Sequence, residues 1–385
     1  MEIERHLIML PGPTNVPDRV MMAMMKPLIN HRGPEFSALL DSISAGLKYV
    51  FETKEDVYVL TSSGTGSVEC AVSNVVNRGD KVIVPVFGYF SERLKEKVAR
   101  HGGEVVELPV EWGKAPTAEQ IETIMEREKN IRLVAVVHNE TSTGATVRDL
   151  SKMAEIAREN DALLMADSIS ILGGDYLPVD KWGIDLCVTG IQKCLACPPG
   201  LALISVGKRA WETIEKKNEK PPYYFDLPSI RDHWLRKETP FTPAISLYYA
   251  LDEALKIIRD EGLEKRFQRH ARCAKAFYAA FEALGLKPYA AENVRSNTVI
   301  AVTVPSGVDP NKVREIMKDR YKVVITGGLG KIQRLIFRIG CMGTISEAEV
   351  TTTIGALENT LSDLEYPVRR GAGTEAARRS LHSKE

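Results

Sequence analysis

The sequence predicts an α/β protein with a mostly parallel sheet in a large domain and a smaller α+β domain at the carboxyl end. From about residue 57, short apolar runs alternate with stretches in which apolar residues recur at spacings of three and four. Repeated β-α-β units of this kind form parallel sheets that helices cover on both faces. After about residue 265 the pattern changes, and 385 residues are enough for two domains.

Seven apolar runs are predicted to be strands of the large sheet, and amphipathic segments between several of them are predicted helices. The predicted strands are 57–61, 81–86, 104–110, 133–138, 162–167, 186–189 and 201–206. The predicted helices are 66–76, 92–100, 119–129 and 150–159. Because ligands collect at the carboxyl ends of parallel strands, the loops that follow several of these strands are expected to surround one crevice.

The remaining chain predicts a smaller unit with its own sheet. A helical region over 246–284 is interrupted near Gly262. The elements after it are strands 298–304 and 335–340, a helix around 310–321 and a final helix over 346–364. We therefore predict a large domain of residues 1–265, a small domain of residues 266–366 and a tail of residues 367–385. The tail has little to bury and is expected to be mobile.

Composition and charge exclude several classes of protein. Lys and Arg total 51 and Asp and Glu total 51, so the balance predicts neither a nucleic-acid partner nor an anionic membrane. No run of about 18 apolar residues is present, which predicts no membrane span. The first ten residues contain charges and predict no signal peptide. The six cysteines show no framework spacing, so we expect free thiols and a cytoplasmic enzyme.

A glycine-bearing turn at residues 62–67, Ser-Ser-Gly-Thr-Gly-Ser, stands between a predicted strand and a predicted helix. Backbone N–H groups at a helix start can hold a phosphate, and glycine allows it to approach closely. The alternative is an ordinary turn with a Ser or Thr helix cap. Glu69 stands where a third glycine of a dinucleotide fingerprint would be, which disfavours a nicotinamide dehydrogenase.

Two ionisable residues follow predicted strands at the same edge of the sheet. Asp167 ends the apolar run Leu-Leu-Met-Ala-Asp and needs a cationic partner to stay ionised there, although it could instead cap the next turn. Lys193 follows a short strand, and a lysine with a depressed pKa condenses with carbonyl groups, whereas most lysines reach solvent. Cys194 and Cys197 form a single C-x-x-C without a second pair, so no metal site is predicted.

One arginine interrupts an apolar strand of the smaller domain. Arg338 lies in Ile-Phe-Arg-Ile-Gly, where a guanidinium needs a carboxylate partner. A substrate carboxylate can serve through a two-pronged contact. An internal salt bridge or an edge position explains the pattern equally well.

Together these features resemble the class V aminotransferases, in particular the alanine–glyoxylate and serine–pyruvate aminotransferase group. The match runs over about residues 6–365. The motifs that carry it are Pro-Gly-Pro-Thr at 11–14, Asn-His-Arg-Gly-Pro-Glu-Phe at 30–36, Ser-Gly-Thr-Gly-Ser at 63–67, His-Asn-Glu-Thr-Ser-Thr-Gly at 138–144, Asp-Ser-Ile-Ser at 167–170, Gln-Lys-Cys at 192–194, Pro-Pro-Gly at 198–200, Gly-Gly-Leu-Gly at 327–330 and Arg-Ile-Gly at 338–340.

The resemblance implies a type I pyridoxal-phosphate fold, an enzyme with pyridoxal 5′-phosphate as cofactor, and a homodimer with active sites at the subunit boundary. Lys193 would be the Schiff-base lysine that also moves the proton of the substrate Cα. Asp167 would hold the pyridine nitrogen protonated, so that the ring remains an electron sink. Arg338 would bind the substrate α-carboxylate. The main chain around Gly12, within an amino-terminal segment of residues 1–20, would line the pocket.

The same resemblance assigns further residues to the cofactor. Phe90 would stack on the ring where many relatives have Trp, and Thr141 would hydrogen-bond the phenolic oxygen. Thr242 would reach the phosphate of the neighbouring subunit. A tyrosine that some relatives carry three positions earlier is Thr239 here. The remaining predicted phosphate ligands are Thr65, Gly66, Ser67 and Gln192.

The expected reaction is transamination between a small L-amino acid, alanine or serine, and glyoxylate or pyruvate, because one arginine accounts for one carboxylate. Related enzymes that use aspartate, aminoethylphosphonate or pyridoxamine remain alternatives. A lyase of the cysteine desulfurase type would need a reactive cysteine on a mobile loop, and the candidates are Cys194 and Cys341. A scaffold protein that has lost turnover would be expected to lose Lys193 or Asp167 first, and both are present.

Overall fold

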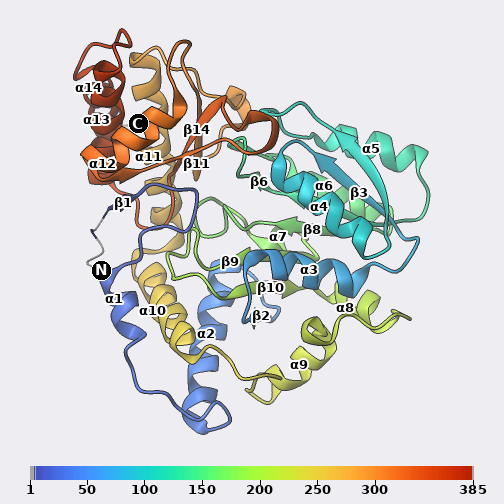
Figure 1. Cartoon of the computed structure of the whole chain (residues 1–385). Helices are drawn as coiled ribbons and strands as arrows, with labels where there is room; N and C mark the ends of the chain where they lie inside the picture. Colours follow the sequence, from blue (N-terminus) through green and yellow to red (C-terminus); the bar gives the residue numbers. More distant parts are fainter. Residues whose placement is uncertain (1–3, 5, 384–385) are drawn as a thin grey trace.

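The computed structural model describes residue 4 and residues 6–383, and Figure 1 shows two lobes joined by long helices. The larger lobe is built on a seven-stranded sheet in the order β2-β10-β9-β8-β5-β3-β4. Its strands are β2 (Val57–Leu60), β3 (Lys81–Val86), β4 (Glu104–Pro109), β5 (Ile131–Val137), β8 (Leu163–Asp167), β9 (Leu186–Gly190) and β10 (Ala202–Val206). The predicted sheet is confirmed, and its strands run parallel except β10, which is antiparallel to both β2 and β9.

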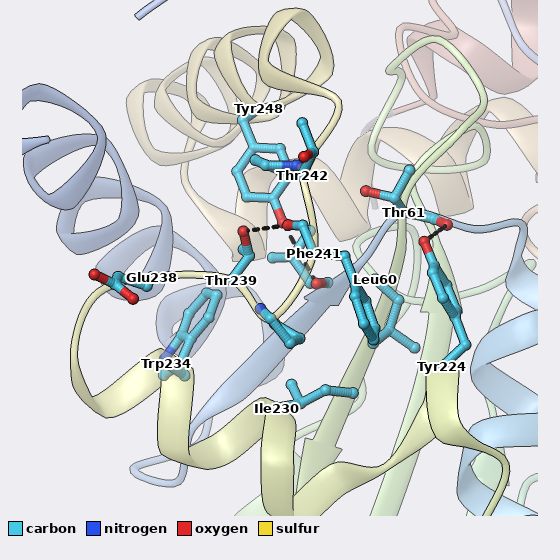
Figure 2. A pocket seen from close by; sticks show the side chains of 13 residues that line it. Leu60, Thr61, Tyr224, Ile230, Trp234, Glu238, Thr239, Phe241, Thr242 and Tyr248 are labelled. Atoms are coloured by element: carbon cyan, nitrogen blue, oxygen red, sulfur yellow. Dashed lines mark hydrogen bonds between the residues drawn. The ribbon is translucent and has the colours of Figure 1, made fainter. Parts of the chain in front are cut away.

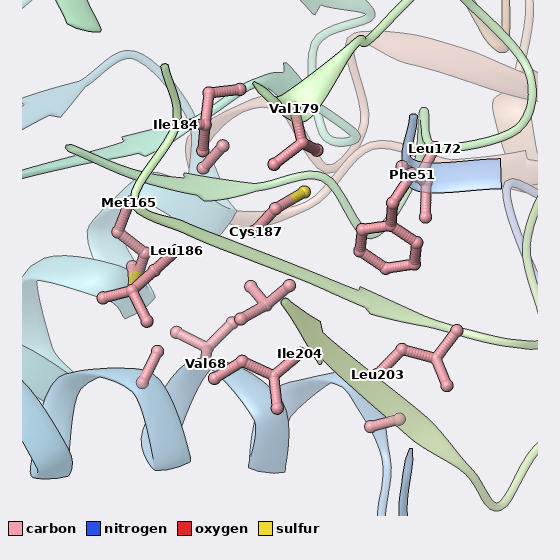
Figure 3. Close-up of a cluster of buried hydrophobic side chains, with 14 of the residues drawn as sticks. Phe51, Val68, Met165, Leu172, Val179, Ile184, Leu186, Cys187, Leu203 and Ile204 are labelled. Atoms are coloured by element: carbon pink, nitrogen blue, oxygen red, sulfur yellow. The ribbon is translucent and has the colours of Figure 1, made fainter. Parts of the chain in front are cut away.

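Helices cover both faces of this sheet because its strands are apolar on both sides. The helices of the large lobe are α1 (Asp18–Ala23), α2 (Pro34–Phe51), α3 (Gly64–Val75), α4 (Tyr89–Arg100), α5 (Ala118–Arg127), α6 (Leu150–Glu159), α7 (Val179–Trp182), α8 (Lys208–Glu215), α9 (Leu227–Leu235) and α10 (Ile245–Glu261). In Figure 3, Val68 of α3 and Ile204 of β10 lie on one side of the sheet, whereas Cys187 of β9 points to the other side, toward Val179. Because helices pack on both faces of the sheet, only the ends of its strands are left uncovered and able to form a site.

The smaller lobe has its own core around a three-stranded sheet in the order β11-β14-β13. Its strands are β11 (Val299–Thr303), β13 (Thr326–Gly327) and β14 (Ile336–Gly340). Its helices are α11 (Leu263–Ala283), α12 (Pro310–Tyr321), α13 (Glu347–Asp363) and α14 (Ala372–His382). A short amino-terminal strand, β1 (Leu7–Ile8), pairs with β12 (Val323–Val324), so the start of the chain is attached to this lobe. The two apolar clusters meet along α11, and the boundary at residue 265 stays a prediction.

The predicted mobile tail differs from the structure. Residues 372–382 form α14, which packs against α11 and α13. Ala376 and Ala377 are buried there, and Leu381 lies in the apolar cluster of the small lobe. Small apolar residues give a weak sequence signal, but against a closely packed helix they bury enough surface to hold the segment. No helix in the described part of the chain is both long and apolar enough to cross a bilayer.

Candidate active site

A cavity of about 140 Å³ opens at the carboxyl ends of β8 and β9. It lies where the parallel strands were predicted to form a crevice. Six of the predicted site residues line it, and they come from five separate segments of the chain: Thr65, Phe90, Thr141, Asp167, Gln192 and Lys193. The fold therefore brings together residues that are up to 128 positions apart in sequence, from Thr65 to Lys193.

Lys193 points toward the amino-terminal segment of the chain. Its Nζ donates a hydrogen bond to the carbonyl oxygen of Pro11. Gly12 has φ +92°, and a Cβ placed on it would lie 2.7 Å from that Nζ, so glycine is required by the close approach as well as by the backbone. Burial, with a smaller contribution from the positive charge of Arg338, lowers the pKa of Lys193 to about 8. A minor fraction of this amine, roughly one in ten, is thus neutral at pH 7.

Asp167 ends β8 and is nearly fully buried. Its Oδ1 accepts a hydrogen bond from the backbone N–H of Ile169 at 3.2 Å. Asp167 therefore caps the turn that follows β8 and also lines the cavity. Burial raises the pKa of Asp167 to about 6, although the hydrogen bond from Ile169 and the charge of Lys97 lower it. A cationic group in the cavity would lower this pKa again and be held by the carboxylate.

The start of α3 is open to an anion. Its N-cap residue Ser63 makes no side-chain capping bond, so the first-turn N–H groups lack that acceptor. Gln192 also lines the cavity, but its buried unpartnered atom is the amide oxygen, an acceptor, so only its NH2 group could donate to an anion. Ser67 is different: its hydroxyl donates to the carbonyls of Gly64 and Thr189, and its side chain does not line the cavity. Its predicted role as a phosphate ligand stays a prediction, as does that of Gly66.

Arg338 lies in β14 and reaches the large lobe. Its Nε donates to the carbonyl of Gly327 at 2.8 Å, and its Nη1 donates to the carbonyl of Thr141 at 3.1 Å. Burial lowers the pKa of Arg338 to about 10, still far above neutral pH. Among the residues that the structure describes, no carboxylate forms a salt bridge with it. The internal salt bridge that the sequence left open is therefore not formed within the described chain. The edge position is not found either, because β14 is the central strand of the small sheet, and a role in carboxylate binding stays a prediction.

Thr242 is the predicted site residue that the fold keeps apart from the others. It is exposed and lines a different cavity, which Figure 2 shows between Tyr248, Trp234 and Leu60. Thr239 lies beside it and donates to the carbonyl of Phe241 at 2.8 Å. Within one chain Thr242 does not reach the Lys193 cavity, and a role there requires a second chain.

Glu140 is a functional candidate that the sequence reasoning missed. It is fully buried, and its two carboxylate oxygens accept five hydrogen bonds. The donors are the backbone N–H groups of Phe90, Ser91 and Ser142 and the hydroxyls of both serines. Glu140 thereby fixes the start of α4, which carries Phe90, next to Thr141. An acid two residues after the predicted strand 133–138 was the available sequence signal.

We expect Glu140→Gln to weaken cofactor binding about tenfold to 100-fold, because the amide NH2 would face N–H and O–H donors instead of accepting from them. Fluorescence titration with pyridoxal 5′-phosphate measures this. Glu358→Gln is the matched control, since Glu358 is equally buried but accepts from Thr374 in the small lobe. Equal affinities in the two variants would contradict the role given to Glu140.

Two basic residues of α4 also line the cavity and were missed. Arg93 donates to the hydroxyl of Thr65 at 3.2 Å, and its guanidinium lies 5.8 Å from the centre of the Phe90 ring. Lys97 donates to the carbonyl of Arg93 at 3.3 Å, and burial lowers its pKa. Their spacing of three and seven from Phe90 places all three on one helix face, which is the signal that could have identified them.

All six cysteines are free thiols and buried. Burial raises the pKa of Cys194 to about 12, and it raises that of Cys341 well above the ordinary value. Buried thiols with raised pKa values are poor nucleophiles. The chemistry that a cysteine desulfurase needs is therefore absent from the two candidate cysteines.

Comparisons with known proteins agree with this geometry. The sequence model of the class V aminotransferase family matches residues 8–345. The chain is 43% identical to an uncharacterized aminotransferase of Methanocaldococcus jannaschii over 98% of both chains. It is 36% identical to a serine–glyoxylate aminotransferase of Methylorubrum extorquens over 97% of this chain and 95% of that one. The structure of a ureidoglycine–glyoxylate aminotransferase from Bacillus subtilis superposes with a TM-score of 0.94 at 30% identity, covering 100% of both chains.

Proposed function

Because this chain belongs to the class V aminotransferases, we propose that it transfers the amino group of a small L-amino acid, alanine or serine, to glyoxylate or pyruvate. The observation that carries the proposal is the meeting of the Lys193 amine and the Asp167 carboxylate in one cavity. Glyoxylate as acceptor is supported by the names of two similar proteins, a serine–glyoxylate and a ureidoglycine–glyoxylate aminotransferase.

The residues of the cavity fit pyridoxal 5′-phosphate, the cofactor of this class of enzyme. The uncapped start of α3 suits a phosphate, and Arg93 adds a positive charge beside Thr65. Phe90 offers an aromatic face for the ring, and Thr141 offers a hydroxyl. When bound, the cofactor supplies a sink for the electron pair that remains at Cα after a proton leaves.

Lys193 moves the proton in the proposed reaction. Its Nζ takes the proton from the substrate Cα as a neutral amine and can return it as an ammonium group. A pKa of about 8 makes both forms accessible near neutral pH. Asp167 stays ionised when a cation faces it, and it would hold a proton on the ring nitrogen. Asp167 is nearly fully buried, which limits the access of water to its carboxylate.

Arg338 determines how many carboxylates of the substrate the site can bind. Its bonds to Gly327 and Thr141 use Nε and Nη1 and fix the plane of the guanidinium. The remaining N–H groups can hold one α-carboxylate with two parallel bonds. Arg93 and Lys97 contact Thr65 and the α4 backbone, so we assign them to the phosphate end and not to a second substrate carboxylate. Because no basic residue is assigned to a second carboxylate, we expect the amino donor to have a small neutral side chain.

Absorbance spectra of the purified holoenzyme test this function. Alanine, serine and aspartate are added singly, and glyoxylate or pyruvate is added afterwards. We expect the band of the lysine-bound cofactor to disappear with alanine or serine and to return with glyoxylate. A response to aspartate alone would contradict the assignment of Arg93 and Lys97, and no response to any donor would contradict the proposed function.

We also propose that the enzyme is a cytoplasmic homodimer with Thr242 at the partner's site. Thr242 is exposed and apart from the Lys193 cavity, which supports a contact across subunits. Exposed apolar side chains cluster after β1, which supports a covered face: Met21, Met22, Met25 and Leu28. The free thiols support a reducing compartment. Sedimentation velocity should give the mass of two chains, and a single-chain mass would contradict the proposal.

A further inference from the structure

Two arginines and one glutamate meet where α10 ends and α11 begins. Glu261 is the last residue of α10, and Gly262 separates it from α11. Glu261 accepts from Arg266 Nη1 at 2.7 Å, and it accepts from Arg269 Nε and Nη2 at 2.6 and 3.0 Å. Burial alone would raise the pKa of Glu261, but the bonds and charges of both arginines lower it overall. We refer to Glu261, Arg266 and Arg269 as the junction cluster.

Arg266 connects the cluster to two loops of the large lobe. It is almost fully buried, its Nε donates to the carbonyl of Gly173 at 2.9 Å, and its Nη2 donates to the carbonyl of Cys194 at 2.5 Å. Gly173 lies in the turn that follows Asp167 at the end of β8. Cys194 directly follows Lys193. The planar guanidinium has its donors in a fixed geometry, so it sets the distance between these two loops.

Arg269 connects the same carboxylate to the small lobe. Its Nη1 donates to the carbonyl of Ile345 at 2.5 Å, and its Nη2 donates to that of Gly343 at 3.1 Å. Both carbonyls lie in the loop that follows β14, the strand that carries Arg338. Figure 1 shows α10 and α11 meeting where the two lobes join. One carboxylate therefore ties together loops from both lobes.

We propose that the junction cluster is a set of positioning residues that hold the three segments after Asp167, Lys193 and Arg338 in register. The inference rests on the proposed function, in which Asp167 holds the ring nitrogen, Lys193 accepts the proton and Arg338 binds the carboxylate. None of the cluster residues lines the cavity, so they act through backbone carbonyls and not on the substrate. A shift of about 1 Å in such a segment can cost about 100-fold in rate.

The test compares Arg266→Gln with Arg209→Gln. Arg209 donates to the carboxylate of Asp185 at 3.1 Å and to the carbonyl of Ala162 at 2.7 Å, so it makes the same two kinds of bond at the amino ends of β8 and β9, away from the cavity. The readouts are thermal stability, kcat and KM for serine, and hydrogen–deuterium exchange of residues 191–197 in the protein without cofactor.

Both variants are expected to lose stability, but only Arg266→Gln should lower kcat, by about tenfold to 100-fold with little change in KM. It should also speed exchange in residues 191–197, where Ala196 and Cys197 donate to Lys193 and Ile191. Arg266→Lys keeps the positive charge but lacks the planar guanidinium with its several donors, so it should not restore kcat. If Arg266→Gln does not fold, Glu261→Gln takes its place, since it leaves both arginines present.

The proposal is overturned if Arg266→Gln keeps the kcat of Arg209→Gln, if exchange in residues 191–197 stays at the wild-type rate, or if Arg266→Lys recovers kcat in full. The exchange readout needs no turnover. A wild-type enzyme that reacts with no amino donor would count against the proposed function, while the exchange result would still decide the role of the junction cluster.

Discussion

Replacing Lys193 by alanine is expected to slow the half-reaction with serine by about 10⁴-fold, because it removes the amine to which the proton transfer at the substrate Cα is assigned. Stopped-flow absorbance of the bound cofactor measures the rate. Lys217→Ala is the matched control, since burial also lowers the pKa of Lys217 and it also donates to a backbone carbonyl, that of Val76. A Lys193→Ala protein that reacts at the wild-type rate would remove Lys193 from the mechanism.

The lowered pKa of Lys193 gives this prediction a pH dependence. Only the neutral amine reacts with a carbonyl group, and with a pKa of about 8 roughly one amine in ten is neutral at pH 7. Binding of pyridoxal 5′-phosphate to the protein without cofactor should therefore become faster as the pH rises and level off above about 8. A rate that keeps rising to the pKa of an ordinary lysine would show that burial does not shift this amine.

Arg338→Gln is expected to raise KM about 100-fold for the amino donor and for glyoxylate alike, because two charge-assisted bonds to the α-carboxylate contribute about 3 kcal/mol. Steady-state kinetics with both substrates measures the effect. Arg338→Lys restores the charge but not the two-pronged geometry and should recover only part of it.

Cofactor affinity provides the control for Arg338, because its guanidinium bonds the backbone carbonyls of Gly327 and Thr141 and is assigned to the substrate and not to the cofactor. The affinity for pyridoxal 5′-phosphate should stay unchanged in Arg338→Gln. Unchanged KM values for both substrates would mean that the carboxylate binds elsewhere, and a large loss of cofactor affinity would mean that the substitution disturbs the whole site.

Much of the fold could be predicted because the strands of a doubly covered sheet are apolar on both faces and the helices between them are amphipathic. β3 is found at the predicted residues, and α6 has the predicted bounds. Asp167 and Lys193 could be proposed as site residues because charged side chains at strand ends stand out against apolar runs. α2 was not predicted as a helix from its own pattern, although it is 18 residues long.

The junction cluster could not be predicted for a physical reason. Two of its acceptors are the carbonyls of Gly173 and Gly343, and a backbone carbonyl leaves no mark in the sequence. Its charged members look like any solvated helix face, since Glu, Arg and Arg at short spacing are common there. Glu140 was not predicted as a site residue for a related reason. Two of its donors are the N–H groups of Phe90 and Ser91 at the start of α4, which only the folded chain brings near.

The antiparallel direction of β10 has a consequence for how sequence change is tolerated around the site. Residues 191–201, which carry Lys193, join β9 to β10 as a hairpin connection whose two ends are paired in the sheet, Gly190 opposite Ala202. Connections that pass through a helix can absorb an inserted residue in their loops, but a hairpin fixed at both ends must bulge or slip its register. Length variation among descendants of this chain should therefore accumulate in other connections and spare the one that carries the catalytic lysine.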